Sequence, residues 1–143
     1  KNGLIKGSGI WRNSEVADPT TGEFRRISGQ HPFDYDLHFS QDLPKLNLTY
    51  GAFVEGGFQQ RFYRFNALDA TKLDPYLMAF VEWRPRKDLN VRIELDNLTR
   101  RGYRRTTLTY PGPRNAGGAP TLSDRDNHFG RFVYLRLRKS FGG

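Results

Sequence analysis

Three side chains of the kind that hydrolases use lie two residues apart in one segment of the chain. Asp36, His38 and Ser40 alternate with apolar residues, so in an extended strand they would share one face. Residues two apart on a strand are separated by about 7 Å, whereas a Ser–His–Asp relay needs heavy-atom distances of about 3 Å. The spacing predicts a hydrated row of polar side chains, and we expect no enzymatic activity.

Metal and cofactor chemistry has equally little support in the sequence. His31 and His128 have no ligand partners at metal-binding spacing, and the chain contains no cysteine. The pair Gly7-x-Gly9 lacks the rest of any phosphate-binding glycine motif. We therefore expect neither a metal site nor a cofactor.

Basic and aromatic side chains interleave in residues 61–65 and 101–105, and the formal net charge is +8. In a nucleic-acid-binding protein, such residues would stack on bases and contact phosphates. Arginines can equally line the water-filled interior and the loops of a membrane barrel. The positive charge alone leaves both interpretations open.

Alternation of apolar and polar residues is the dominant pattern, while helical periodicity is almost absent. The pattern predicts an all-β fold of antiparallel, amphipathic strands. We expect about six strands, at residues 3–11, 31–43, 46–58, 73–84, from 89 with a continuation toward 110, and 128–141.

The connections between these strands are expected to alternate in length. Residues 43–45 and 85–88 are tight turns, whereas the stretches 12–31, 59–72 and 111–127 are long and polar. Short turns at one end and long loops at the other are typical of outer-membrane β-barrels. In that arrangement the long loops face outside the cell and the short turns face the periplasm.

Strand parity makes a more specific prediction for the hairpin around residues 85–88. Trp83 and Leu89 both belong to the apolar face, which restricts the register of the two strands. Glu82 then lies beside Arg92 on the polar face, in position for a cross-strand ion pair. Trp83 would lie near the short turn, where barrels carry an aromatic girdle.

The last segment is a long amphipathic strand that ends on an aromatic residue. Val133, Leu135, Leu137 and Phe141 share one parity, and only two glycines follow Phe141. This is typical of the final strand of an outer-membrane barrel. No amphipathic helix is available to cover the apolar faces, and about six strands are too few to close around a packed interior.

The segment from residue 88 to residue 103 resembles the penultimate strand of TonB-dependent receptors. Asn97, Leu98, Thr99 and Tyr103 match the element that follows this strand, whereas Arg100 replaces the usual acidic residue. Residues 73–85, 110–115 and 131–141 are also similar to the C-terminal barrel of that family. The resemblance extends from about residue 28 onward.

The resemblance implies that residues 1–143 are the C-terminal segment of a larger outer-membrane barrel, without the N-terminal plug domain. Such receptors import scarce ligands, for example metal chelates, cobalamin or saccharides. Implied partners are outer-membrane lipid, the β-barrel assembly machinery, TonB acting through a plug that this chain lacks, and an unknown small-molecule ligand. The assembly signal would be carried by Val133, Leu135, Leu137 and Phe141.

If the chain is such a barrel wall, ligand contacts are expected from the long loops and the inner face. The candidates are Arg61, Tyr63, Arg64, Arg114 and Arg125. Two alternatives stay open: a small complete outer-membrane barrel with extra strands from residues 12–31 and 100–124, and a soluble basic β-domain that binds nucleic acid. We favour the cell outer membrane and expect no nucleic-acid partner.

Overall fold

A computed structural model describes residues 2–141 of the chain. It is all-β and every strand pair is antiparallel. The strands are β1 (Gly3–Trp11), β2 (Val16–Ala17), β3 (Phe24–Arg25), β4 (Phe33–Leu43), β5 (Leu48–Glu55), β6 (Phe58–Tyr63), β7 (Ala67–Leu73), β8 (Tyr76–Arg86), β9 (Leu89–Asp96), β10 (Gly102–Thr109), β11 (Thr121–His128) and β12 (Phe132–Lys139).

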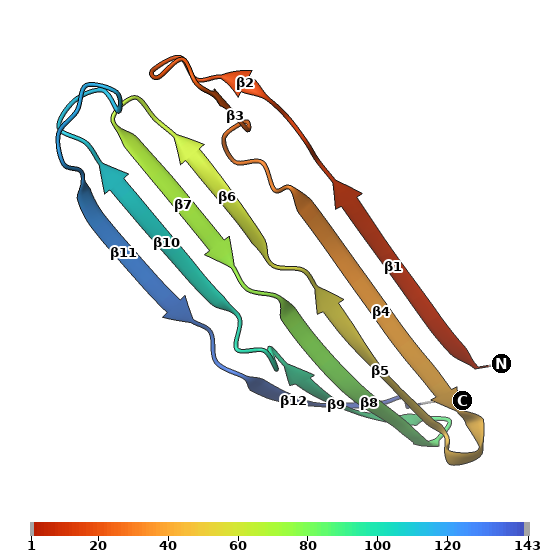
Figure 1. The fold of residues 1–143 in the computed structure, drawn as a ribbon. Coiled ribbons are helices and arrows are strands. Elements are labelled where there is room, and N and C mark those ends of the chain that lie inside the picture. The colour runs from red at the N-terminus through yellow and green to blue at the C-terminus, as the bar shows by residue number, and fades with distance from the viewer. Residues whose placement is uncertain (1, 142–143) are drawn as a thin grey trace.

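Two sheets follow one another along the length of the molecule (Figure 1). The six-stranded sheet has the order β1-β4-β5-β8-β9-β12, and the four-stranded sheet has the order β11-β10-β7-β6. A small ribbon of β2 and β3 lies beyond the upper end of β1. Within residues 2–141 no sheet closes on itself, because the two edge strands of each sheet have only one neighbour.

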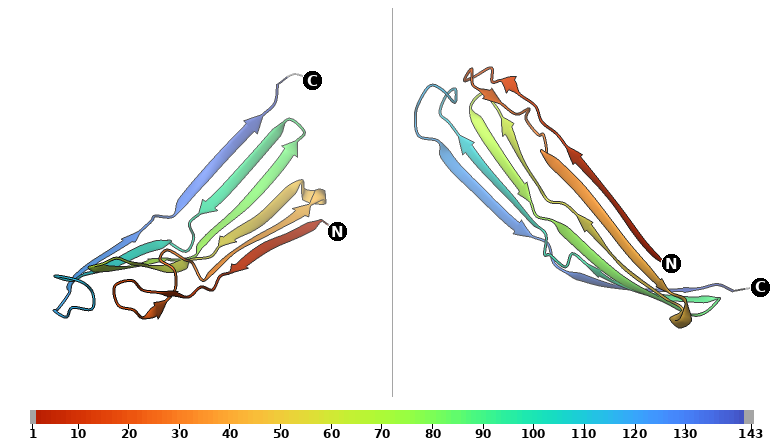
Figure 2. Two further views of the ribbon diagram at one scale, coloured as in Figure 1. Left: turned by 90° about the horizontal axis from the view of Figure 1, so that it is seen from above. Right: turned by 45° about the vertical axis from the view of Figure 1, so that its right-hand side comes forward.

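The molecule is a single curved layer of strands (Figure 2). Among the described residues, extensive contacts join only strands that are paired neighbours within a sheet. Ala67 is the one buried apolar side chain in that part of the chain. Both faces of the layer are therefore open, and there is no hydrophobic core between layers.

Each strand of the four-stranded sheet continues in line with a strand of the six-stranded sheet. The pairs Leu48–Trp83 and Phe58–Leu73 have the same sum of residue numbers, so pairing does not slip between β5/β8 and β6/β7. Between β8/β9 and β7/β10 the register shifts by two residues. An even shift keeps side chains on the same face, so each face runs through both sheets.

The junction between the sheets is a line of interruptions at residues 56–57, 74–75, 97–101 and 129–131, which we call the break line. Pro75 cannot donate a ladder hydrogen bond, and Asn97 and Arg100 adopt φ values of 54°. The Asn97 side chain is buried and donates to the carbonyl oxygens of Phe129 at 3.1 Å and Gly130 at 2.8 Å. The segment that resembles the receptor family thus connects two neighbouring strands across the break.

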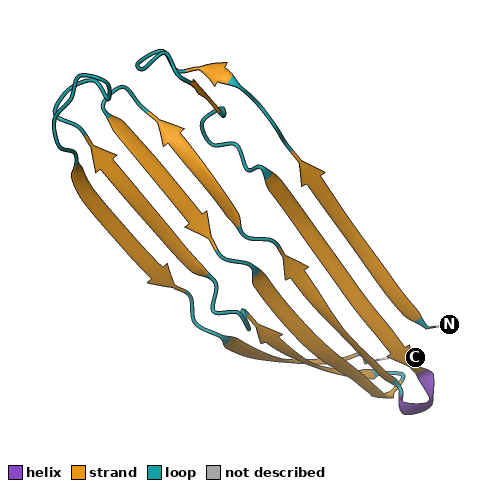
Figure 3. Cartoon of the chain, viewed as in Figure 1, coloured by secondary structure: helices purple, strands orange, loops and turns teal. Residues whose placement is uncertain are grey.

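Several expectations about strands are confirmed. The expected strand 3–11 matches β1, and β4, β5, β8, β9 and β12 fall within the other expected segments to within a few residues. Glu82 pairs with Arg92, and their charged atoms are 3.6 Å apart. The short 3-10 turn η1 (Pro44–Leu46) and the turn before β9 connect strands at one end of the layer (Figure 3).

Other expectations are wrong. Residues 59–72 do not form a long loop, since β6 and β7 occupy most of this stretch and a tight turn at 64–66 joins them. Residues 121–127 belong to β11, which shortens the last loop to 110–120. The expected fifth strand is divided at the break line into β9 and β10, and the expected final strand begins only at Phe132, after the interruption at residues 129–131. Residues 12–31 add only the separate β2–β3 ribbon and no strand to the six-stranded sheet.

Candidate functional site

A cavity of about 600 Å³ lies on the polar face of the four-stranded sheet. Its floor comes from β6, β7 and β10, and its side comes from the segment that runs from β3 toward β4. Five lining residues are cations and none is a carboxylate. The charged lining residues are Arg25, Arg26, Arg61, Lys72 and Arg104.

Strand register brings the cations of the floor together. Lys72 pairs with Gln59 on one side and with Arg104 on the other. Arg61 pairs with Ala70, two residues further along the same face of the sheet. Neighbouring strands are about 4.8 Å apart, so three cationic side chains arise from a small area of one face.

Two of the three floor cations contact carboxylates that do not line the cavity. Lys72 Nζ lies 3.0 Å from Asp74, and Arg104 Nη2 lies 2.5 Å from Asp124. The hydrogen bond from Arg104 lowers the pKa of Asp124. Among the described residues, Arg26 and Arg61 have no ion-pair partner. The cavity therefore has a surplus of positive charge.

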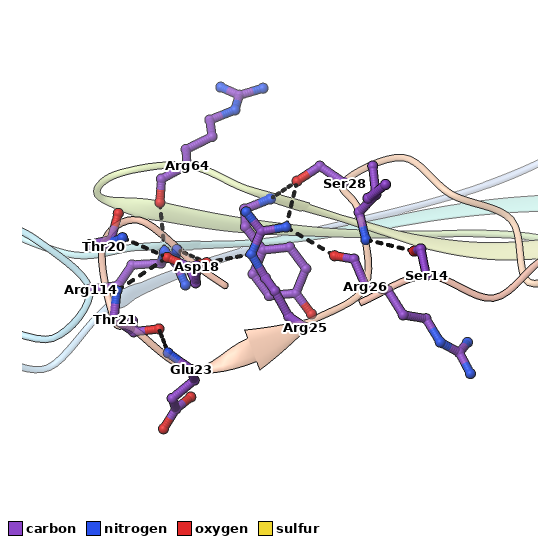
Figure 4. Close-up of polar contacts among 12 residues, drawn as sticks. Ser14, Asp18, Thr20, Thr21, Glu23, Arg25, Arg26, Ser28, Arg64 and Arg114 are labelled. Carbon is purple, nitrogen blue, oxygen red and sulfur yellow. Dashed lines mark hydrogen bonds and ion pairs between the residues drawn. The ribbon is translucent and has the colours of Figure 1, made fainter. Parts of the chain in front are cut away.

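The rim of the cavity is held by a buried carboxylate (Figure 4). Asp18 is only 2% exposed and accepts hydrogen bonds from Arg25 Nε and Arg114 Nη2, both at 2.5 Å. The backbone N–H groups of Thr20 and Thr21 donate to the same carboxylate. The Arg114 hydrogen bond is the main reason why the pKa of Asp18 lies far below its usual value, despite the opposing effect of burial.

Arg25 and Arg114 also contact the ring of Tyr63. Their guanidinium carbons lie 4.4 Å and 5.4 Å from the ring centre, which is within the range of cation–π attraction. Arg114 Nε further donates to the Arg64 carbonyl oxygen at 2.6 Å. These contacts join the β2–β3 ribbon, the turn at 64–66 and the loop at 110–120, and we call them the Asp18 clamp.

The structure separates the five residues expected to bind ligand. Arg61 and Tyr63 line the cavity. Arg114 lies beside Tyr63, but its guanidinium group is bound to Asp18. Arg64 lies 3.1 Å from Asp69 Oδ2. Arg125 is paired in register with Arg105 on β10, whose parity is opposite to that of Arg104, so it belongs to the other face.

Sequence reasoning missed Arg25, Arg26, Lys72 and Arg104 as members of the same cavity. Lys72 and Arg104 carry no local motif, and only the pairing of β7 with β10 makes them neighbours. A parity analysis of residues 67–73 and 102–109 could have placed each cation on a face. It could not have shown that the segment near Arg26 folds over that face.

The histidines and the triad-like row have structural contacts. His31 stacks on Phe58 at 3.9 Å and bonds to Asp34 and Gln60. His38 packs against Phe53, and in the described chain no hydrogen bond joins it to Asp36 or Ser40. Residues 2–141 contain no group of three or more potential metal ligands.

Three of the four residues expected to form the assembly signal lie on the apolar face of β12. Val133, Leu135 and Leu137 point to one face and are about 70% exposed, at 72%, 70% and 70%. Phe141 follows the strand and is 83% exposed, with Lys139 Nζ 5.1 Å from its ring centre.

Comparisons with known proteins identify no relative. No family model, curated protein or solved structure matches this chain. None of the helices in the described chain is long and apolar enough to cross a membrane.

Proposed function

We propose that this chain is part of the wall of a transmembrane β-barrel in the outer membrane, of the TonB-dependent receptor class, which imports a scarce small-molecule ligand. The observation that carries the proposal is the apolar face of the six-stranded sheet. Side chains of matching parity make this face continuous from β1 to β12. Examples from successive strands are Ile5, Leu37, Val54, Ala79, Ile93 and Leu135.

Water is an unsuitable neighbour for such a face. A soluble domain covers an apolar sheet face with a second layer, and residues 2–141 provide none. Lipid would remove the apolar side chains from water without a second protein layer. Strands that cross a membrane need about 9–11 residues when tilted, and β1, β4 and β8 have 9, 11 and 11 residues.

Both tryptophans of the chain fit this orientation. Trp11 ends β1 next to the break line, and Trp83 pairs with Leu48 near the turns at the opposite end of the six-stranded sheet. They belong to the apolar face and are 74% and 49% exposed. Barrels carry aromatic side chains at both membrane interfaces, so the tryptophans would mark the two edges of the lipid-facing band.

The opposite face would then line the interior of the barrel. It carries Asp36 and His38 from β4, Glu82 from β8, and Arg92 and Glu94 from β9. Arg92 interacts with both Glu82 and Glu94. Ion pairs of this kind suit a water-filled interior, where partial hydration lowers the cost of burying charge.

Single-cysteine labelling tests the proposal, because the natural chain has no cysteine. In protein reconstituted into lipid vesicles, a thiol from Leu135→Cys should be protected from a water-soluble maleimide and quenched by lipid-soluble probes. A thiol from Arg136→Cys, the next residue on the polar face, should react with the maleimide. Equal reaction of both thiols with the water-soluble reagent would contradict a lipid-facing sheet.

The partners of the proposed receptor are outer-membrane lipid, the β-barrel assembly machinery and TonB acting through a plug domain. Depletion of the assembly machinery should leave the protein unfolded, with unshifted mobility when unheated samples are run on a gel. Replacing Phe141 together with Leu137 by serine should have the same effect, while a Ser123→Ala control should fold normally. Normal folding of the double variant would argue against an assembly signal in these residues.

A further inference from the structure

The cation-lined cavity supports an inference about the ligand. We propose that this cavity binds a small molecule with two or more phosphate or carboxylate groups. The assignment rests on the proposed function, because the polar face carrying the cavity would be the inner face of the barrel. It adds the chemical class of the ligand, which the barrel architecture by itself leaves open.

The cations of the cavity floor lie close enough together to repel one another. Like charges placed directly opposite on neighbouring strands are destabilising, and Lys72 and Arg104 are directly opposite on β7 and β10. Asp74 and Asp124 offset part of this repulsion from outside the cavity, and an anion that bridges the two cations would reduce it further. Their carboxylate partners, Asp74 and Asp124, do not line the cavity, so the space between the cations is open to a ligand.

Arg26 and Arg61 have no ion-pair partner within residues 2–141 and are therefore available to a ligand. Figure 4 shows the Arg26 side chain extending away from the Asp18 clamp. The clamp holds its backbone, because Arg25 Nη1 donates to the Arg26 carbonyl oxygen at 2.9 Å. Arg61 arises from the floor. Two guanidinium forks can each bind a carboxylate or phosphate through paired hydrogen bonds.

Size and surroundings limit the ligand to a small molecule. The volume of about 600 Å³ is within the range of about 300–1,000 Å³ that is usual for small-molecule sites. Tyr63 and Phe24 add aromatic surface, and Gln59 adds an amide. The lining therefore combines anion-binding groups with an apolar wall for the ligand skeleton.

The test is a binding titration on the protein purified from membranes in zwitterionic detergent. The probes are inorganic pyrophosphate and tricarballylate, with acetate as a monovalent control, followed by calorimetry at constant ionic strength. Pyrophosphate or tricarballylate should bind at one site per chain and acetate should not. Arg61→Gln and Arg26→Gln should each weaken binding about tenfold, equivalent to about 1.4 kcal/mol.

Arg125→Gln is the matched control, because it removes the same charge from the opposite face. It should leave the affinity unchanged. Equal weakening by Arg125→Gln and Arg61→Gln would mean attraction to net charge only and would overturn the proposal. Absence of saturable binding by either probe would also overturn it, whereas failure of the barrel assignment would appear separately in the cysteine labelling.

A further measurement distinguishes two natural sources of the anionic groups, a lipid headgroup and a soluble small molecule. Lipopolysaccharide added to the detergent should displace bound pyrophosphate if the natural ligand is a lipid headgroup. No displacement would assign the cavity to a soluble anion. Both outcomes keep the shared chemistry of the ligand, which the variants test independently.

Discussion

Each face of the layer runs through both sheets, but the two sheets carry different side chains on it. On the outer side of β12, in the six-stranded sheet, Val133, Leu135 and Leu137 are apolar and exposed. On the same side of β7 and β10, in the four-stranded sheet, Asp69 lies among Thr107, Arg105 and the Arg64 guanidinium group. Since parity is kept across the break line, the same face changes from apolar to polar side chains along the strands.

This difference between the sheets indicates that an apolar environment would end at the break line. The apolar side of the six-stranded sheet is suited to lipid, and the same side of the four-stranded sheet is suited to water. Burial alone would raise the pKa of Asp69, but the Thr107 hydrogen bond and the arginines outweigh it and lower that pKa. An ionised carboxylate in this position fits the proposal that these strands extend into water beyond a lipid-facing band.

The largest expected effect comes from placing a charge on the outer face. Leu135→Arg should destabilise the folded protein in lipid vesicles by about 2–4 kcal/mol, the cost of arginine near the midplane of a lipid-facing strand. Ser123→Arg, on the outer face of β11, should change stability by less than about 0.5 kcal/mol. Urea titrations followed by gel mobility measure both, and equal costs would remove the distinction between the sheets.

A second prediction concerns the connection between the two regions. Asn97→Ala should cost about 2–4 kcal/mol, because it leaves the carbonyl oxygens of Phe129 and Gly130 without donors and places alanine at a positive φ. Asn97→Asp keeps the acceptor for the Arg101 N–H but places a buried carboxylate against the two carbonyl oxygens, so it should cost at least as much. Hydrogen exchange of β10 and β11 amides would show whether the loss spreads beyond the break line.

The Asp18 clamp predicts that stability depends on pH in the part of the molecule beyond the break line, around the four-stranded sheet and the β2–β3 ribbon. The folded-state pKa of Asp18 is lowered, so its ionised form stabilises the fold above its unfolded-state pKa of about 3.9, and this stability is lost as the pH falls below that value. Asp18→Asn should cost about 1–3 kcal/mol at pH 7. The stability gap between wild type and variant should narrow at pH 3; a constant gap would contradict the ionised clamp.

The smallest expected effect comes from the polar face of the six-stranded sheet. Glu82→Gln removes the ion pairs with Arg92 and with the exposed Arg84 but can keep the hydrogen bond from Asn90. A hydrated pair of this kind contributes about 0.5 kcal/mol, so the urea midpoint should move little. A loss of several kcal/mol would indicate that this face is dry and would argue against a water-filled interior.

Local pattern was sufficient for the six-stranded sheet and insufficient for the four-stranded one. In β9 every second residue is apolar, and in β4 only Gln41 interrupts the same pattern, so the location and facing of both strands could be predicted. In β6, β7 and β11 both faces carry polar residues, and the same rule assigned residues 59–72 and 121–127 to loops. These strands form because their backbone groups pair with neighbours, which is a property that side-chain alternation does not record.

The sequence by itself determined the all-β fold, the strands of the apolar sheet, the side on which each of their residues lies and the Glu82–Arg92 pair. Each depends on alternation within a strand or across one short hairpin. Only the tertiary structure decided the break line, the Asp18 clamp and the cavity. Their members are far apart in the chain, as are Asp18 and Arg114, and register between strands and the path of the loops bring them together.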